Sequence, residues 1–154
     1  MSKCLNQDFL DYSIIRINNK KMKNLDDELT YKIIGCAMKV HNTLGNGFQE
    51  VIYQRCLAIE LEKAGLEFQR EQEMPIYYEG IEVGKRRADF LVEGKVMVEI
   101  KAIIKLEPVN LTQGLNYLTA YNYDIGLLIN FGSTSLEYKD CSERIKNIPK
   151  ILES

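Results

Sequence analysis

Residues 87–102 read RADFLVEGKVMVEIKA, and this stretch decides how the chain folds. Two apolar runs meet at Glu93-Gly94, a dipeptide that is typical of a β-hairpin turn. Three charged residues, Asp89, Glu99 and Lys101, interrupt the runs where buried strand is expected. Because side chains alternate along a strand, the length of the turn determines which face of the sheet each charge occupies.

The turn length follows from where the apolar side chains would go. A two-residue loop would pair Asp89 with Val98 and mix charged and apolar residues on both faces. A three-residue loop, with Gly94 in a left-handed conformation, instead gathers the apolar side chains on one face. Burying that face is favoured, since each misplaced large aliphatic side chain forfeits roughly 1.5–3 kcal/mol. The sequence therefore predicts a three-residue loop and this apolar face: Ala88, Phe90, Val92, Val96, Val98 and Ile100.

The opposite face of the hairpin then carries two acids and a lysine. An ordinary solvent-exposed sheet face explains such a trio without any function. Helical patterns on both sides of the hairpin, however, predict a half-covered face, where unpaired carboxylates are costly unless they bind a cation. Two neighbouring carboxylates, Asp89 and Glu99, form a hard-oxygen site suited to Mg²⁺ or Mn²⁺. Lys101 would then hold an anionic substrate or the attacking water, and the residues leave both interpretations open.

Periodic patterns on either side of the hairpin predict helices and further strands. Apolar residues recur at helical spacing behind the acidic residues 26–28, and the continuous apolar run at 125–131 is typical of a strand covered on both faces. The order of helix, helix, three meandering strands, helix and strand predicts an α/β sandwich with a mixed sheet. The expected helices are 26–44, 50–64 and 108–121, and the expected strands are 66–78, 81–92, 96–104, 125–131 and 136–138.

Length and composition indicate one folded domain inside the cell. The chain has 154 residues, of which 45% are hydrophobic and 27% charged, near the averages for globular proteins. No apolar run approaches the roughly 20 residues that span a bilayer. The N-terminus lacks a signal-peptide pattern, so a cytoplasmic location is expected. We expect a polar extension at 1–24 with one candidate strand at 12–17, a domain at 25–142, and a tail at 143–154.

Charge and metal-binding residue types argue against two other classes of protein. With 20 Lys and Arg against 22 Asp and Glu, no global positive field draws the chain to nucleic acid, although a local basic groove is compatible with these counts. The four scattered cysteines and the single His41 form no usual zinc pattern. Cys36 and Cys56 lie in helical apolar patterns, which predicts core residues rather than reactive thiols. A lone histidine near a helix end is most often a capping or packing residue, so His41 is not a catalytic candidate.

The acids and the lysine resemble the core of the PD-(D/E)XK nuclease superfamily, in which an Asp on one strand and an E-x-K on the next build a metal site. The match is Asp89 followed by Glu99-Ile100-Lys101. The segment GFQEVIY at 47–53 resembles the signature of the small GxxExxY family within that superfamily, as do VHNTLGNGFQE, RRADFLVEGK, VEIKA and LINFG over roughly residues 28–139. The resemblance implies a restriction-endonuclease-like three-layer α/β/α core with a mixed central sheet.

The resemblance also implies roles for individual residues. Asp89, Glu99 and the Ile100 carbonyl would hold Mg²⁺ or Mn²⁺, and Glu50 would reach the ion directly or through water. An acid at a helix N-terminus is also stabilised by about 0.3–1 kcal/mol without any catalysis, which is the other reading of Glu50. Gln113 matches a glutamine that orients the water or the lysine, although an exposed amide explains it equally well. Tyr53 fits a core anchor as well as a site residue.

The function implied by the resemblance is hydrolysis of nucleic acid by a Mg²⁺-dependent nuclease, with DNA the expected substrate and a homodimer one expected assembly. The alternative is a catalytically silent, nuclease-like module that binds nucleic acid or a protein. The basic run before Asp89 fits either phosphate contacts beside the metal or a solvated strand. The expected substrate-binding residues are Lys85, Arg86, Arg87, Lys105 and Tyr117.

Overall fold

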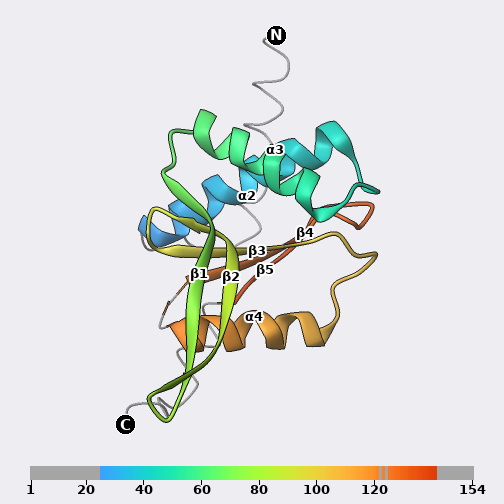
Figure 1. The fold of residues 1–154 in the computed structure, drawn as a ribbon. Coiled ribbons are helices and arrows are strands. Elements are labelled where there is room, and N and C mark those ends of the chain that lie inside the picture. Colours follow the sequence, from blue (N-terminus) through green and yellow to red (C-terminus); the bar gives the residue numbers. More distant parts are fainter. Residues whose placement is uncertain (1–24, 122, 124, 142–154) are drawn as a thin grey trace.

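The computed structural model describes residues 25–121, 123 and 125–141 (Figure 1). The expected strand at 12–17 and the tail at 143–154 lie outside this part of the chain. Among the described residues, no helix combines the length and the apolar character needed to cross a membrane. The helices are α2 (Leu25–Leu44), α3 (Glu50–Lys63) and α4 (Pro108–Tyr121), and the strands are β1 (Phe68–Tyr78), β2 (Ile81–Val92), β3 (Val96–Lys101), β4 (Ile125–Asn130) and β5 (Glu137–Asp140).

The five strands form one mixed sheet in the order β1-β2-β3-β4-β5. Strands β3 and β4 are parallel, and the other neighbouring pairs are antiparallel. Helices α2 and α3 cover one face of the sheet and α4 covers the other (Figure 1). The predicted α/β/α architecture is therefore confirmed. The largest difference in length is at β3, which ends at Lys101, three residues before the expected end, and the other expected ends differ by at most two residues.

The predicted register of the β2–β3 hairpin is confirmed. Val92 pairs with Val96 across a three-residue loop, and the pairing continues to Phe90 opposite Val98. Gly94 has the expected positive φ of 63°, and Glu93 also lies in the left-handed region with φ 53°. The Glu93 N–H group donates a 2.8 Å hydrogen bond to the Glu67 carbonyl, which ties this turn to the segment before β1.

One residue of the predicted apolar face is on the wrong side of the sheet. Most of that face packs into the main core beneath α2 and α3, but Ala88 joins a second cluster with Met97 and Leu128 on the α4 side. The alternation changes at Asp89, one residue beyond the last β2–β3 pair, where the opposing β1 residue Glu71 has a φ of 50°. The irregular backbone of Glu71 therefore marks the point at which the two faces of β2 exchange sides.

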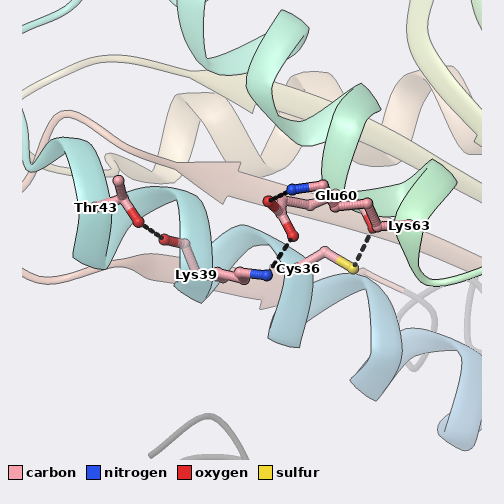
Figure 2. Close-up of polar contacts among 5 residues, drawn as sticks. All are labelled: Cys36, Lys39, Thr43, Glu60 and Lys63. Carbon is pink, nitrogen blue, oxygen red and sulfur yellow. Dashed lines mark hydrogen bonds and ion pairs between the residues drawn. The ribbon is translucent and has the colours of Figure 1, made fainter. Parts of the chain in front are cut away.

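Helices α2 and α3 are joined by a small polar cluster around Glu60 (Figure 2). The Glu60 carboxylate pairs with Lys39 at 3.0 Å and with Lys63 at 3.6 Å, and its backbone carbonyl accepts a 3.5 Å contact from the Cys36 thiol. Burial, together with the Glu60 carboxylate, raises the pKa of Cys36 to about 11. Cys36 is thus a buried, protonated thiol, and the partly buried Cys56 packs against the same core, as the sequence predicts.

Candidate functional site

The two strand carboxylates meet where the β2–β3 pairing ends. Asp89 is partly buried, and its Oδ2 accepts a 2.7 Å hydrogen bond from the Ile100 N–H group. Glu99 is only 8% exposed. Its Oε2 lies 3.8 Å from the Arg86 guanidinium, whereas its buried Oε1 has no hydrogen-bond partner in the described part of the chain. This pair therefore contains a buried acceptor with unused capacity.

The hydrogen bond from Ile100 replaces a bond of the sheet. In an antiparallel ladder, the N–H and C=O groups of one hydrogen-bonded residue point to the same neighbouring strand. Ile100 lies two residues beyond Val98, the last β3 residue paired with β2, and its N–H group is taken by the Asp89 side chain. The Ile100 carbonyl consequently points to the β2 side as well. The Ile100 backbone and the Asp89 carboxylate therefore lie on the same side of β3, and the joint role of Asp89, Glu99 and the Ile100 carbonyl as metal ligands stays a prediction.

Electrostatics in this pair favour a bound cation. Burial, followed by repulsion from the Asp89 carboxylate, raises the pKa of Glu99 to about 7, against the lowering effect of Arg86 and Lys101. Burial also raises the pKa of Asp89, although the Ile100 N–H group lowers it. Two carboxylates that repel each other in a partly dehydrated site are oxygen ligands of the kind that Mg²⁺ and Mn²⁺ prefer. The donor set and the unused Glu99 oxygen therefore fit a divalent metal.

Lys101 and Glu50 interact electrostatically with this acid pair. The charge of Lys101 lowers the pKa of Asp89, Glu99 and Glu50, so its ammonium lies near all three carboxylates. Burial raises the pKa of Glu50 itself, the first residue of α3. Within the described ranges, no group of three His, Cys, Asp or Glu side chains is placed to hold a metal ion. The role of Glu50, as a metal contact or as an acid stabilised by the helix N-terminus, stays a prediction.

The two α4 candidates are less closely tied to the acids. Gln113 is exposed, and it forms no hydrogen bond with a described residue. The next residue, Gly114, lines a small cavity together with Glu99, so this turn of α4 approaches Glu99. Tyr117 belongs to α4, but its side chain lies outside what the structure describes. The roles of Gln113 and Tyr117 stay predictions.

The basic candidates lie along β2 and after β3. Arg87 and Lys85 are exposed and share the carboxylate of Glu73 on β1, at 3.2 Å and 4.0 Å. Arg86 points instead toward Glu99. Lys105 is exposed in the segment between β3 and α4. A phosphate contact by any of these four side chains stays a prediction, and Arg86 lies nearest to the acids.

Sequence reasoning missed Gln54, which lies next to Asp89. This buried glutamine donates a 3.2 Å hydrogen bond from its side-chain amide to Asp89 Oδ1. Its carbonyl oxygen accepts a 3.1 Å hydrogen bond from Arg70 on β1. Gln54 lies four residues after Glu50, hence on the same side of α3, and this spacing is the sequence signal that points to it.

Sequence reasoning also missed Asn130, which fixes the chain after Lys101. This fully buried asparagine accepts hydrogen bonds of 3.0 Å from the N–H groups of Ile103 and Gly132, and it donates one of 2.9 Å to the Ile103 carbonyl. A side chain at Gly132 would lie 2.4 Å from the Ile103 backbone, so only glycine fits there. The Phe131 N–H group also donates to the Lys101 carbonyl at 2.8 Å.

Two residues left open by the sequence serve packing. Tyr53 is completely buried, and its hydroxyl donates a 2.6 Å hydrogen bond to the Gly45 carbonyl and accepts one from the Phe48 N–H group. His41 is buried, and its Nε2 lies 3.0 Å from the Ser133 carbonyl oxygen. Both side chains fasten the loop between α2 and α3, or the end of α2, to the rest of the domain. Two readings were open for Tyr53, and the structure supports the core anchor rather than the site residue.

The fold and the site together define a class of protein. A mixed sheet with helices on both faces, and acids on two of its neighbouring strands, is the restriction-endonuclease-like arrangement. A sequence profile described as "PD-(D/E)XK nuclease superfamily" matches residues 27–144, so the chain belongs to this superfamily. A solved chain titled "Crystal structure of SSO0001" is similar with 15% identity and a TM-score of 0.47, over 93% of this chain and 82% of that one. No curated protein matches significantly.

Proposed function

We propose that the protein is a divalent-metal-dependent nuclease that hydrolyses phosphodiester bonds of nucleic acid, with DNA as its substrate. Membership of the superfamily supports the class of reaction. The observation that carries the proposal is the close pair of Asp89 and Glu99, in which one buried carboxylate oxygen lacks a partner among the described residues. Such a pair is unfavourable by itself and is relieved by a dication.

Each site residue is given a role in the proposed reaction according to its position. Asp89, Glu99 and the Ile100 carbonyl would hold Mg²⁺ or Mn²⁺, with Glu50 acting through water. The ion supplies a Lewis acid for the scissile phosphodiester. The Lys101 ammonium lies beside the acids, where it stabilises negative charge that develops on the phosphate or holds the attacking water. Gln113 is proposed to orient that water.

The remaining proposals concern substrate and location. Lys85, Arg87 and Lys105 are exposed, and we propose that they contact the phosphates of the nucleic-acid strand near the acids. Arg86, which pairs with Glu99, would be the closest of the basic residues to the metal. Tyr117 on α4 is proposed to contact the substrate as well. The cysteines that the structure describes are free thiols, which is consistent with a reducing cytoplasm. We also propose that the chain belongs to the GxxExxY family and that it forms a homodimer.

Metal binding tests the proposal directly. Mn²⁺ is titrated by calorimetry into the wild-type protein and into Asp89→Asn and Glu99→Gln, with the exposed Glu62→Gln on α3 as the matched control. We expect the two site variants to lose Mn²⁺ binding and the control to retain it. Wild-type protein that binds no Mn²⁺, or site variants that bind it equally well, would sink the proposal.

Cleavage tests the role of Lys101. Duplex, single-stranded and branched DNA, together with RNA, are incubated with wild-type protein, Lys101→Ala, and the control Lys95→Ala in the hairpin loop. We expect cleavage of DNA by the wild type and the control and its loss in Lys101→Ala. Equal cleavage by all three preparations would indicate a contaminating nuclease.

The catalytically silent module is kept as a second candidate for one reason. Gln113 forms no hydrogen bond with the acids or with Lys101, although the proposed chemistry assigns it a task there. The same two experiments separate the candidates. Binding of nucleic acid without Mn²⁺ binding and without cleavage would select the silent module.

A further inference from the structure

We propose that Gln54 is a positioning residue for the metal site: it fixes the orientation of the Asp89 carboxylate, and Arg70 in turn fixes Gln54. The inference rests on the proposed metal site and adds to it a support that comes from α3 and β1. It concerns three side chains joined end to end by hydrogen bonds, from Arg70 through Gln54 to Asp89.

The chemistry of Arg70 determines which way the Gln54 amide faces. A guanidinium has only donors, so the group that it contacts must be an acceptor. Arg70 therefore selects the carbonyl oxygen of Gln54, at 3.1 Å, and leaves the amide N–H₂ group to face Asp89 Oδ1 at 3.2 Å. Gln54 is only 5% exposed, so water competes little for these contacts. The amide is thus held in one of its two orientations.

The two donors on Asp89 then fix its carboxylate. Oδ1 receives the Gln54 amide and Oδ2 receives the Ile100 N–H group. The terminal torsion of an aspartate is otherwise soft, and rotation about it would break both hydrogen bonds. Each carboxylate oxygen has about two acceptor positions, so each keeps one for a further ligand. Partners of this kind typically change metal affinity by about 10–100-fold when they are removed.

Arg70 acts on the site through Gln54. It lies on β1 opposite Phe90, and its guanidinium sits 5.9 Å from the centroid of the Phe90 ring. It forms no salt bridge with an acid in the described part of the chain. Among the residues that the structure describes, the polar link from Arg70 to the carboxylates therefore runs through the Gln54 side chain. Removal of Arg70 should have no effect on metal binding once Gln54 has been removed.

A double-mutant cycle tests this dependence. Gln54→Met keeps the volume of the side chain and removes both hydrogen bonds, and Arg70→Met removes the guanidinium. We expect Gln54→Met to weaken Mn²⁺ binding by about tenfold or more, Arg70→Met to weaken it by a smaller factor, and the double variant to match Gln54→Met within about twofold. The controls Gln69→Met and Arg55→Met, at exposed positions on β1 and α3, should stay within about twofold of the wild type.

Thermal unfolding of every variant separates a positioning role from a structural one. The expected result is a loss of Mn²⁺ affinity in Gln54→Met that persists at temperatures where the variant is fully folded. Wild-type affinity in Gln54→Met would overturn the inference. So would losses that multiply in the double variant, because Arg70 would then act independently of Gln54.

A metal-free measurement keeps the test informative if the proposed function fails. The side-chain amide resonances of Gln54 are recorded by NMR in wild type, Arg70→Met and Asp89→Asn, without added metal. We expect both substitutions to shift these resonances and to leave those of Gln69 in place. If the wild type binds no Mn²⁺ but the Gln54 resonances shift, the proposed function is wrong and the hydrogen-bonded chain is real. Unmoved Gln54 resonances would contradict the chain itself.

Discussion

The two ends of the β2–β3 hairpin differ in what holds them together. At the turn, Val92 and Val96 pair through their backbones and bury their side chains in the main core. Beyond Phe90 and Val98, a carboxylate of Asp89 replaces the backbone acceptor for Ile100. The closed end contributes stability, whereas the open end leaves polar atoms available for a ligand. One pair of strands thus supplies both the scaffold and the site.

The largest expected effect comes from breaking the closed end at Phe90. This side chain is completely buried and packs edge-on against Phe68, with ring centroids 5.6 Å apart. Phe90→Ala should lower the free energy of unfolding by about 3–5 kcal/mol, measured by urea denaturation. Tyr78→Ala, at an exposed position of the same sheet, should change it by less than about 0.5 kcal/mol. Similar effects of the two substitutions would show that burial of the hairpin in the main core does not contribute this stability.

A somewhat smaller loss is expected from removing the support of the open end at Asn130. Asn130→Ala leaves the Ile103 backbone and the Gly132 N–H group without their partner, at a cost of about 3 kcal/mol in urea denaturation. Cleavage should fall as well, because the segment after Lys101 loses its attachment. The control is Asn46→Ala, because this asparagine also contacts Gly132, at 3.4 Å from the carbonyl oxygen, but its side chain is exposed. Its removal should therefore cost much less stability. A stable Asn130→Ala variant with full activity would argue against the attachment.

The next prediction concerns the pH dependence of stability at Glu99. Because folding raises the pKa of Glu99 to about 7, the folded state holds a proton that the unfolded state releases near its ordinary pKa of 4.5. The stability contributed by this group is fully present below pH 4.5 and is lost as the pH rises to 7. The loss is on the order of 3 kcal/mol in the absence of metal, since one pKa unit corresponds to about 1.4 kcal/mol.

Substitution of Glu99 should remove that slope. In EDTA, Glu99→Gln should gain stability relative to the wild type as the pH is raised from 4.5 to 7, when both are measured by urea denaturation. The exposed Glu62→Gln control should follow the wild type across the same range. Parallel profiles for wild type and Glu99→Gln would show that the buried carboxylate carries no such penalty.

The smallest effect is expected at the boundary between the two ends. Glu71 lies opposite Asp89 with a φ of 50°, a conformation that costs a residue with a side chain about 1–2 kcal/mol. Glu71→Gly should therefore stabilise the protein by about 0.5 kcal/mol, after the entropy cost of glycine in a strand is subtracted. Gln72→Gly, at the next position, should destabilise it by about 0.5–1 kcal/mol. Denaturation curves in which both variants lose stability would contradict the backbone strain assigned to Glu71.

The sequence predicts these two ends unequally well. The turn follows from the alternation of apolar residues alone, because one register buries them all on one face. The same register brings Asp89 and Glu99 to the same end of the hairpin, but the side of the sheet on which Asp89 lies does not follow from it, because the alternation of β2 changes at Asp89. Ala88 departs from it, since the reversal depends on the backbone of Glu71 in another strand. Local periodicity contains no information about such a partner.

The supporting residues of the site could not be predicted for a related reason. Gln54 interrupts the apolar pattern of α3, and its partner Asp89 lies 35 residues away. Asn130 lies within the apolar run at 125–131, and nothing in that run indicates its partner until the return of the chain at Ile103 is known. A polar residue in an apolar pattern indicates that a partner is needed, because burial without one is costly. The identity of that partner comes only from the tertiary structure.

Lys101 combines a fixed backbone with a charge that acts on the acids of the site. Its carbonyl is held by Phe131, and two residues later the chain is held again by Asn130. The backbone at Lys101 is therefore fixed in position. The ammonium can move only by rotation about the bonds of its four-carbon side chain. The distance from this fixed backbone to the charge is set by the length of one side chain, so the separation between the ammonium and the acids depends on that length alone.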